Sequence, residues 1–324
     1  MLGRDTNPLT MADVIAAERK IHAVVPPTPL FSVETLNQQL GAKVYLKAES
    51  LQPSGAYKFR GATNKIASLM ELYGKDIKII TASSGNHGMA CALAGKTLGI
   101  QATVVVPEPT PMMKQNAIRS LGANLVVFGE NYDASFAKAC ELSEKEHMYY
   151  VHPVADRFTA SGQGTISLEL LDQLPDVDQV IVPLGGGGLI TGISFVMKAL
   201  KPSVKVIGVM PEGSDVYVQS RKAGKLVELE KCYSMADAVV RKTGEDYLFP
   251  YIEQNVDDIV TVSEDTLKKA VKMACLYGKL TLEGAGALAL ASLLEGKCKA
   301  TENTVLICSG GNIDQGLLEA CLNA

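Results

Sequence analysis

A lysine lies in an unusual setting within PSGAYKFRGA, the stretch from residue 53 to residue 62. Lys58 stands among small, aromatic and apolar residues, with Gly55 and Gly61 on either side. Burial lowers the pKa of a lysine and exposes the free-base amine, which can form an imine with a carbonyl compound. Lys58 is therefore a candidate covalent nucleophile, and an ordinary lysine on a solvated helix face is the alternative.

A run of glycines follows the Val/Ile-rich segment VIVPL and precedes a helix that we expect to open near Leu189. The run consists of Gly185, Gly186, Gly187 and Gly188. Without Cβ atoms, successive backbone N–H groups can approach an anion, and a helix N-terminus adds partial positive charge. The run therefore predicts a phosphate cradle, and a tight turn that only packs strand on helix is the alternative.

The same glycines allow a second interpretation. Gly186, Gly188 and Gly192 are spaced somewhat like a dinucleotide fingerprint, and Glu212 follows near the place of a ribose-binding acid. A nicotinamide-dependent oxidoreductase is therefore an alternative from another cofactor class.

Two further loops carry polar side chains where an expected strand ends. In TASSGNHGMA, the side chains of Ser83, Ser84, Asn86 and His87 stand at a turn between a strand and a helix. Backbone N–H groups at this helix start can hold a substrate carboxylate, and the Asn86 amide can donate to a phenolic oxygen. Helix N-caps are the alternative, and a lone histidine is more commonly structural. Ser309 ends the buried segment TVLIC, where its hydroxyl can meet a ring nitrogen or simply cap a helix.

The elements that must position these residues have the pattern of a parallel sheet. Short apolar runs without alternation predict strands covered on both faces, and helix-like segments lie between them. The expected strands lie within 77–83, 102–107, 123–128, 179–185, 204–211 and 303–311, and the expected helices within 87–99, 110–122 and 133–147. The fold class is doubly wound α/β, in which ligands bind at the carboxyl ends of the strands.

Composition excludes several classes of function. The chain has 324 residues and a net charge of −4, with Lys and Arg scattered singly, so neither nucleic acid nor a membrane is an expected partner. Seven cysteines without a CxxC pair argue against a disulfide framework and a zinc site, and fit a reducing cytoplasm. The N-terminus lacks the apolar core of a signal peptide. The expected partner is a small molecule.

Together the lysine, the glycine cradle, the carboxylate loop and the serine indicate pyridoxal 5′-phosphate. Six motifs resemble, in order, those of the fold-type II pyridoxal-phosphate family of serine/threonine dehydratases and serine racemases: SGAYKFRGA, SSGNHG, SGQGTISLEL, VPLGGGGLITG, VDDIVTVSED and SGGN. The resemblance implies two doubly wound domains with the cofactor in the cleft between them. A large domain would comprise 1–77 plus 153–324, with a small substrate-loop domain of 78–152 inserted. We expect a homodimer and no C-terminal regulatory domain.

The resemblance also implies roles for individual residues. Lys58 would carry the cofactor as an imine and then remove the Cα proton, Tyr57 would flank the ring, and Asn86 would bond the ring's 3′-oxygen. The four glycines and Leu189 would hold the phosphate, and Ser309 would face the pyridine nitrogen. The substrate would be bound by Ser83, Ser84, Asn86 and His87.

The implied reaction is the dehydration of serine, threonine or a related 3-hydroxy amino acid to a 2-oxo acid and ammonia. The alternative is an amino-acid racemase, in which Lys58 and Ser84 serve opposite faces of the carbanion. A β-replacement enzyme is a third candidate, which His87 disfavours because those relatives usually have a threonine there. A ligand-binding relative without turnover is a fourth.

Some residues depart from the family pattern. Met210 and Val216 stand where metal-dependent members have carboxylates, so we predict no metal site, although Glu212 and Asp215 lie nearby. Arg157 stands where proline is common. It would either pair with a second carboxylate on the substrate or lie on the surface, and the surface is the favoured interpretation.

Overall fold

The computed structural model describes residues 3–324, which form two compact units. The first unit combines Met1–Pro26 with Tyr57–Thr165, and the second combines Pro27–Ala56 with Ile166–Ala324. Each unit has its own parallel sheet with helices on both faces. The predicted α/β class with two parallel-sheet domains is confirmed.

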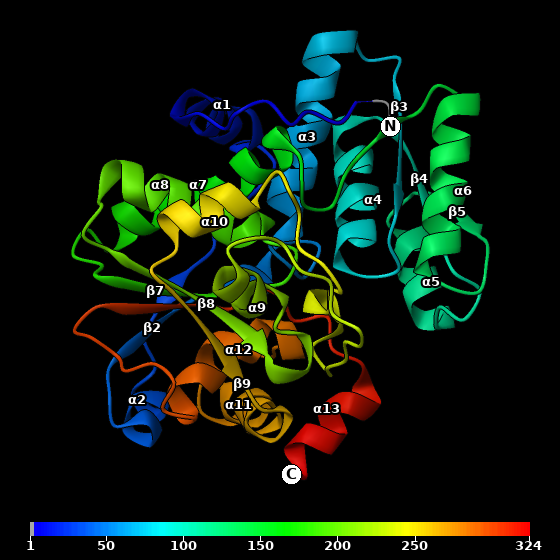
Figure 1. Ribbon diagram of the computed structural model, residues 1–324. Coiled ribbons are helices and arrows are strands. Elements are labelled where there is room, and N and C mark those ends of the chain that lie inside the picture. The colour runs from blue at the N-terminus through cyan, green and yellow to red at the C-terminus, as the bar shows by residue number, and fades with distance from the viewer. Residues whose placement is uncertain (1–2) are drawn as a thin grey trace. The chain divides into compact units, whose positions relative to one another are not determined.

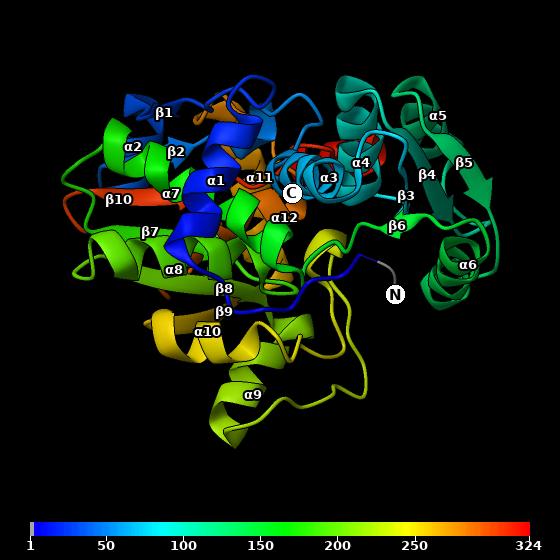
Figure 2. The ribbon, with the colours of Figure 1, turned by 90° about the horizontal axis from the view of Figure 1, so that it is seen from above.

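The first unit contains a four-stranded parallel sheet in the order β5-β4-β3-β6. Its strands are β3 (Lys78–Ala82), β4 (Gln101–Val106), β5 (Asn124–Val127) and β6 (Tyr149–Tyr150). Its helices are α1 (Met11–Ile21), α3 (Lys58–Tyr73), α4 (Asn86–Leu98), α5 (Met112–Ser120) and α6 (Tyr132–Lys145). Figures 1 and 2 show α4 and α6 on opposite faces of this sheet. Alternation along β3 explains this layering, because Ile79 joins the core under α3 and α4 whereas Ile80 joins the core under α6.

The helix that begins at Lys58 belongs to the first unit. Phe59, Ile66 and Leu69 of α3 are buried in one core with Ile79 of β3 and Ala90 of α4. The expected small domain, 78–152, lies wholly inside this unit, which also takes in 57–77 and 153–165. The compact units therefore divide the chain at other positions than the expected domains do, because α3 buries its apolar face against α4.

The second unit contains a six-stranded sheet in the order β1-β2-β10-β7-β8-β9. The strands are β1 (Leu30–Phe31), β2 (Val44–Lys47), β7 (Gln179–Pro183), β8 (Lys205–Pro211), β9 (Asp258–Val262) and β10 (Thr304–Ile307), and only the pairing of β1 with β2 is antiparallel. Every residue of β7 and β10 is buried. Helices α8 (Gly188–Leu200) and α12 (Gly284–Leu294) lie on opposite faces of these strands in Figure 1. Cover on both faces explains the unbroken apolar runs.

Shorter elements complete the second unit and join the strands. The helices are α2 (Glu34–Leu40), α9 (Val216–Ala223), α10 (Phe249–Asn255), α11 (Glu264–Leu276) and α13 (Gln315–Leu322), with 3-10 turns at Glu49–Leu51, Glu212–Ser214 and Asp237–Val239. The helix α7 (Arg157–Gln173) contributes residues to both units.

All six predicted strands and all three predicted helices are confirmed. Sequence reasoning missed the strands β1, β2, β6 and β9. Three of them have two to four residues, too few for hydrophobic periodicity to distinguish a strand from a loop.

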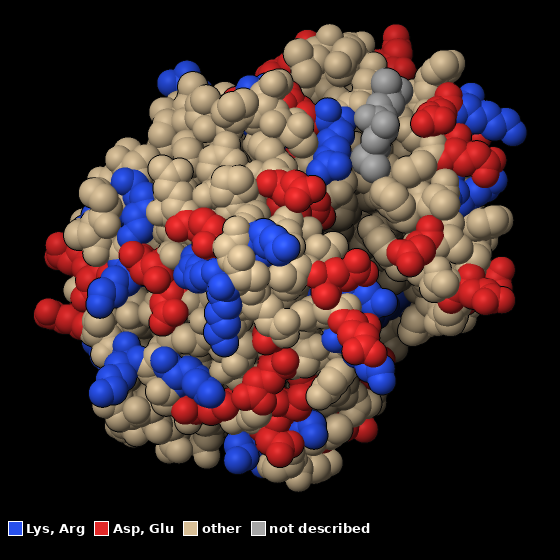
Figure 3. Space-filling view, viewed as in Figure 1, with Lys and Arg blue, Asp and Glu red and all other residues tan. Residues whose placement is uncertain are grey.

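The surface in Figure 3 carries lysine, arginine and acidic side chains interspersed, without a continuous basic stripe on the face shown. None of the helices within residues 3–324 is long and apolar enough to cross a membrane. All seven cysteines are free thiols.

Two glycines allow α3 and the start of α7 to cross closely within the first unit. A Cβ atom on Gly162 would lie 2.7 Å from the Cα atom of Gly61 and 2.9 Å from the carbonyl oxygen of Arg60. Backbone atoms cannot move aside as a flexible side chain can. The crossing lies one turn from Lys58, so glycine at both positions sets where α3 begins relative to α7.

We predict that Gly162→Ala lowers the free energy of unfolding by about 1–3 kcal/mol, because the added methyl group forces two backbones apart. Urea denaturation measures the change. Gly316→Ala in α13 is the matched control, since its Cβ would meet only a side-chain oxygen of Asp314 at 3.3 Å. Equal and small effects of the two substitutions would contradict the close crossing.

Candidate active site

Lys58 is the first residue of α3 and is half-buried. Its Nζ atom donates a hydrogen bond to the carbonyl oxygen of Pro153 at 2.7 Å and lies 5.1 Å from the centre of the Tyr57 ring. The positive end of a helix disfavours a cation, whereas a carbonyl oxygen and an aromatic face favour one. Neutral groups on residues 57 and 153 therefore help to hold the amine in place.

The loop between β3 and α4 carries four of the predicted site residues. Ser83, Ser84 and Asn86 are half-buried, so their polar groups remain accessible. Ser83 Oγ accepts from the backbone N–H of Gly85 at 3.3 Å. The N-cap residue of α4 is Gly85, which has no side chain to cap the helix. The first turn of α4 can thus receive an external anion such as a carboxylate.

His87 is placed differently from its three neighbours. Its side chain is buried, and Nε2 lies 2.9 Å from the carbonyl oxygen of Val151 and 3.4 Å from Sγ of Cys91. Burial raises the pKa of the Cys91 thiol, an effect that the positive charge of Lys58 only partly opposes. The thiol stays protonated and is not a competing nucleophile. These contacts favour the structural interpretation of His87.

The glycine run in the second unit forms a tight turn between β7 and α8. Gly187 has φ +95°, a conformation that favours glycine. A Cβ on Gly185 would lie 2.7 Å from the Cα of Val239, and one on Gly187 would lie 2.8 Å from Cδ1 of Ile252. The helix begins at Gly188, one residue before the predicted Leu189. The backbone N–H groups at this helix start suit a phosphate.

Tyr217 of α9 braces this turn and was missed by sequence reasoning. Its Oη donates to the carbonyl oxygen of Gly186 at 3.1 Å and accepts from the backbone N–H of Glu245 at 3.1 Å. Burial raises the pKa of Tyr217, so the hydroxyl stays protonated and able to donate. No sequence motif marks this residue, because its partners lie 31 and 28 positions away.

Ser309 lies two residues beyond β10 and is 4% exposed. The backbone around it is fixed by an antiparallel bridge between Ala56 and Gly310 and by a hydrogen bond of 3.1 Å from the N–H of Glu283 to the carbonyl oxygen of Gly310. The next helix, α13, is capped by Asp314. Ser309 therefore does not cap that helix, and it lies at the carboxyl end of β10.

The structure shows what surrounds the residues that depart from the family pattern. Met210 and Val216 are fully buried apolar side chains, and within residues 3–324 no group of three or more His, Cys, Asp or Glu could hold a metal ion. Arg157 is 24% exposed and pairs with Asp5 at 2.9 Å and Asp13 at 3.4 Å. Its guanidinium thus pairs with carboxylates near the N-terminus of the chain itself. The two predictions were a carboxylate on the substrate and a free position on the surface.

The residues present suit pyridoxal 5′-phosphate. A lysine amine can bond to the aldehyde, and the backbone N–H groups at the start of α8 can receive the phosphate. A hydroxyl at Ser309 can meet a ring nitrogen. The donor set contains no group that contradicts this cofactor.

Comparisons with known proteins agree with this chemistry. The family described as "Pyridoxal-phosphate dependent enzyme" matches residues 21–310. The chain is 37% identical over 315 residues to the L-threonine ammonia-lyase of Thermotoga maritima. The matched region covers 97% of this chain and 78% of that protein. It is 38% identical to a catabolic L-threonine dehydratase of Staphylococcus aureus, covering 97% of this chain and 93% of that one. The structure of maize serine racemase has a TM-score of 0.91 at 33% identity, covering 98% of each chain.

We predict that Tyr217→Phe weakens the binding of pyridoxal 5′-phosphate by about tenfold, because loss of the hydroxyl frees the Gly186 carbonyl and leaves the Glu245 N–H without its acceptor, a loss of about 1–3 kcal/mol. Equilibrium titration with the cofactor measures the effect. Tyr233→Phe is the control, since Tyr233 is 69% exposed. Unchanged affinity in the Tyr217 variant would show that the turn needs no brace.

Proposed function

The chain belongs to the family of pyridoxal-phosphate dependent enzymes, and on that premise we propose that it is an ammonia-lyase acting on threonine, serine or a related 3-hydroxy amino acid. The observation that carries the proposal is the 37% identity to an L-threonine ammonia-lyase along 97% of the chain. Family membership argues against the nicotinamide alternative, because the glycine turn then receives the phosphate of a different cofactor.

The proposed reaction requires one proton to leave Cα and one hydroxyl to leave Cβ. Pyridoxal phosphate, when bound, supplies an electron sink for the charge left at Cα. Lys58 provides the covalent anchor and then the base for the Cα proton. Water departs, and hydrolysis of the resulting enamine yields the 2-oxo acid and ammonia, with no net oxidation.

Further residues of the chain bind and orient the reactants in this proposal. The backbone N–H groups from Gly185 to Gly188 and at Leu189 hold the phosphate, and the loop with Ser83 and Asn86 holds the substrate carboxylate. Ser309 donates to, or accepts from, the ring nitrogen. A serine cannot keep that nitrogen protonated as a carboxylate would, so charge at Cα is weakly stabilised and prompt loss of the β-hydroxyl is favoured.

A racemase is the second candidate, supported by the similarity to maize serine racemase over 98% of the chain. Racemisation needs a proton donor on the face of Cα opposite Lys58. Ser84 is the residue we propose for it, because its hydroxyl is half-buried in the loop before α4. Both activities can share one site, since they begin with removal of the same proton.

The setting of the enzyme is part of the proposal. We place it in the cytoplasm, supported by seven free thiols that suit a reducing compartment. We propose that it works as a homodimer with amino acids as substrates.

We predict that Lys58→Ala lowers the rate of 2-oxo acid formation from L-threonine and L-serine by at least about a thousandfold, because the variant loses both the anchor and the general base. Mass spectrometry of borohydride-treated wild type should find the cofactor on Lys58. Lys43→Ala, at an exposed site, is the control. A cofactor label on another lysine would refute the assignment.

Ser84→Ala should separate the two candidate activities. The variant loses the donor opposite Lys58, so racemisation should collapse while elimination from the L-enantiomer stays within about tenfold of wild type, or about 1.4 kcal/mol of barrier. Elimination from the D-enantiomer should fall much further. Oxo-acid formation from each enantiomer, together with chiral analysis of unreacted substrate, measures these rates. Equal losses for both enantiomers would mean that Ser84 only shapes the loop.

A further inference from the structure

The carbonyl group that receives the Lys58 hydrogen bond lies in a short loop between β6 and α7. Within this loop, His152 Nδ1 accepts from the backbone N–H groups of Val154 at 3.2 Å and Ala155 at 2.8 Å. The loop carries the Pro153 carbonyl oxygen, which lies 2.7 Å from Lys58 Nζ. The conformation of this short loop therefore sets one contact of the predicted catalytic amine.

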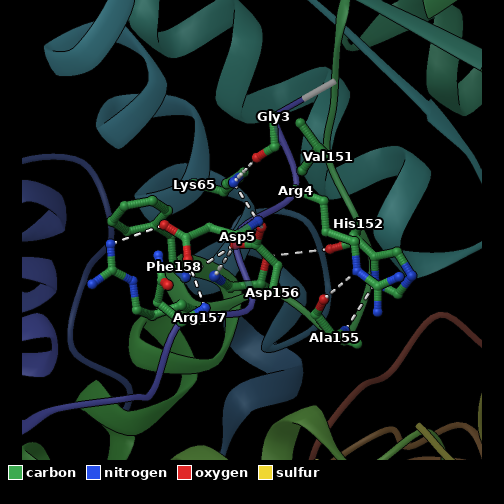
Figure 4. Close-up of polar contacts among 12 residues, drawn as sticks. Gly3, Arg4, Asp5, Lys65, Val151, His152, Ala155, Asp156, Arg157 and Phe158 are labelled. Carbon is green, nitrogen blue, oxygen red and sulfur yellow. Dashed lines mark hydrogen bonds and ion pairs between the residues drawn. The ribbon is translucent and has the colours of Figure 1, made fainter. Parts of the chain in front are cut away.

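A fully buried carboxylate anchors the end of this loop, as Figure 4 shows. Asp156 Oδ1 accepts from the backbone N–H groups of Phe158 at 3.0 Å and Thr159 at 3.2 Å, so it caps α7. Asp156 Oδ2 accepts from Lys65 Nζ at 2.7 Å and from the backbone N–H of Asp5 at 2.9 Å. One side chain thus binds three segments: α3, the start of α7 and the N-terminal segment.

The N-terminal segment crosses the loop as a strap, which we define as Gly3, Arg4 and Asp5. Lys65 Nζ also donates to the carbonyl oxygen of Gly3, and Arg4 Nε donates to that of Ala155 at 3.0 Å. The backbone N–H of Arg157 donates to the carbonyl oxygen of Asp5 at 2.7 Å. Figure 4 shows the strap lying against the loop and Lys65. The strap and the loop are therefore joined on both sides of Asp156.

Two lysines of α3, Lys58 and Lys65, bind the loop at different points. Lys58 and Lys65 are seven residues apart, which places them on one face of the helix about two turns apart. Lys58 bonds to the loop at Pro153 and Lys65 bonds to it at Asp156. The helix and the loop are thus clamped at two points, so the second contact prevents the loop from sliding along α3 away from the first.

We infer that Lys65 and Asp156, with the strap that they bind, are positioning residues for the Lys58 amine. The inference rests on the proposed role of Lys58. A buried ion pair is weak evidence for stability, since apolar side chains of similar volume often serve as well, but its directional bonds hold a geometry. The pair holds the Pro153 carbonyl where one N–H of Lys58 points at it, and this orients the amine.

The test uses the full-length double variant Asp156→Asn/Lys65→Met. The amide oxygen of the substituted side chain can still cap α7, and no buried charge is left unpaired, so the melting temperature should stay within about 4 °C of wild type. The strap loses its bonds to residues 65 and 156, because methionine cannot donate to Gly3 and an amide N–H replaces the acceptor for the N–H of Asp5. Attachment of added pyridoxal 5′-phosphate to the cofactor-free protein, followed by visible absorbance, should slow by about a hundredfold, as a displacement near 1 Å causes.

Steady-state kinetics of the cofactor-loaded enzyme give a second readout. We predict that kcat for L-threonine falls by about a hundredfold, while KM stays within about threefold, because the substrate-carboxylate loop is untouched. A double variant that attaches the cofactor and turns over as wild type does would overturn the inference.

Two single variants test the strap and the helix separately. Arg4→Met removes the guanidinium donor to Ala155 at an exposed position, so the fold should be retained, and attachment should slow by at least about threefold. An unchanged rate would overturn the role of the strap, whatever the double variant does. Glu71→Gln breaks the ion pair of Lys20 and Glu71, also on α3, and should leave attachment unchanged. Slowed attachment in this control would show that any weakening of α3 suffices, and would also overturn the inference.

The attachment measurement separates this inference from the proposed function. If wild type binds the cofactor on Lys58 but converts neither threonine nor serine, the proposed substrates are wrong. The attachment rates of the variants still test whether Lys65, Asp156 and the strap position the amine. If wild type does not attach the cofactor to Lys58 at all, the premise of the inference is refuted.

Discussion

The site depends on one constraint, which is that parallel strands end at the same edge of a sheet. Neighbouring parallel strands are joined through a crossover, here a helix, so the parallel strands of each unit run toward one edge and the loops that follow them collect there. Only β1 runs the other way. In the first unit this edge carries the loop with Ser84 after β3, and in the second unit it carries the glycine run after β7 and Ser309 after β10. Within each unit, residues remote in sequence are thereby brought to one edge of the sheet, even where they do not contact each other.

Buried charge is the second organising feature, and each unit contains a buried lysine that is compensated by an acid. Lys65 is paired with Asp156 in the first unit, and Lys47 is paired with Glu169 at 2.6 Å in the second, where Lys47 also donates to the carbonyl oxygen of Thr28. Removing one partner of such a pair typically costs about 3–5 kcal/mol, because the other charge is left buried and unpaired. Both acids belong to α7 or its cap. These pairs therefore fix the two ends of α7 within the unit to which each end belongs.

Two neutral groups contribute to the position of the Lys58 amine. The amine contacts a carbonyl oxygen and a tyrosine ring, and the nearby Cys91 thiol is kept protonated because burial raises its pKa. In the proposed reaction this amine must leave the carbonyl oxygen and return, which a hydrogen bond to a neutral acceptor allows more readily than one to a carboxylate, because charge-assisted hydrogen bonds are stronger.

The sequence by itself determined the elements and residues whose signals are local. Unbroken apolar runs identified six strands, the glycine run identified the tight turn before α8, and the residues around Lys58 indicated a half-buried lysine, because each signal lies within a short stretch of the chain. The tertiary structure alone decided that α3 packs with α4 and that Tyr217 braces the glycine turn. It also decided that Arg157 pairs with Asp5 rather than lying free on the surface. These contacts join residues separated by tens of positions or more, and hydrophobic periodicity carries no information about which distant residue a side chain will meet.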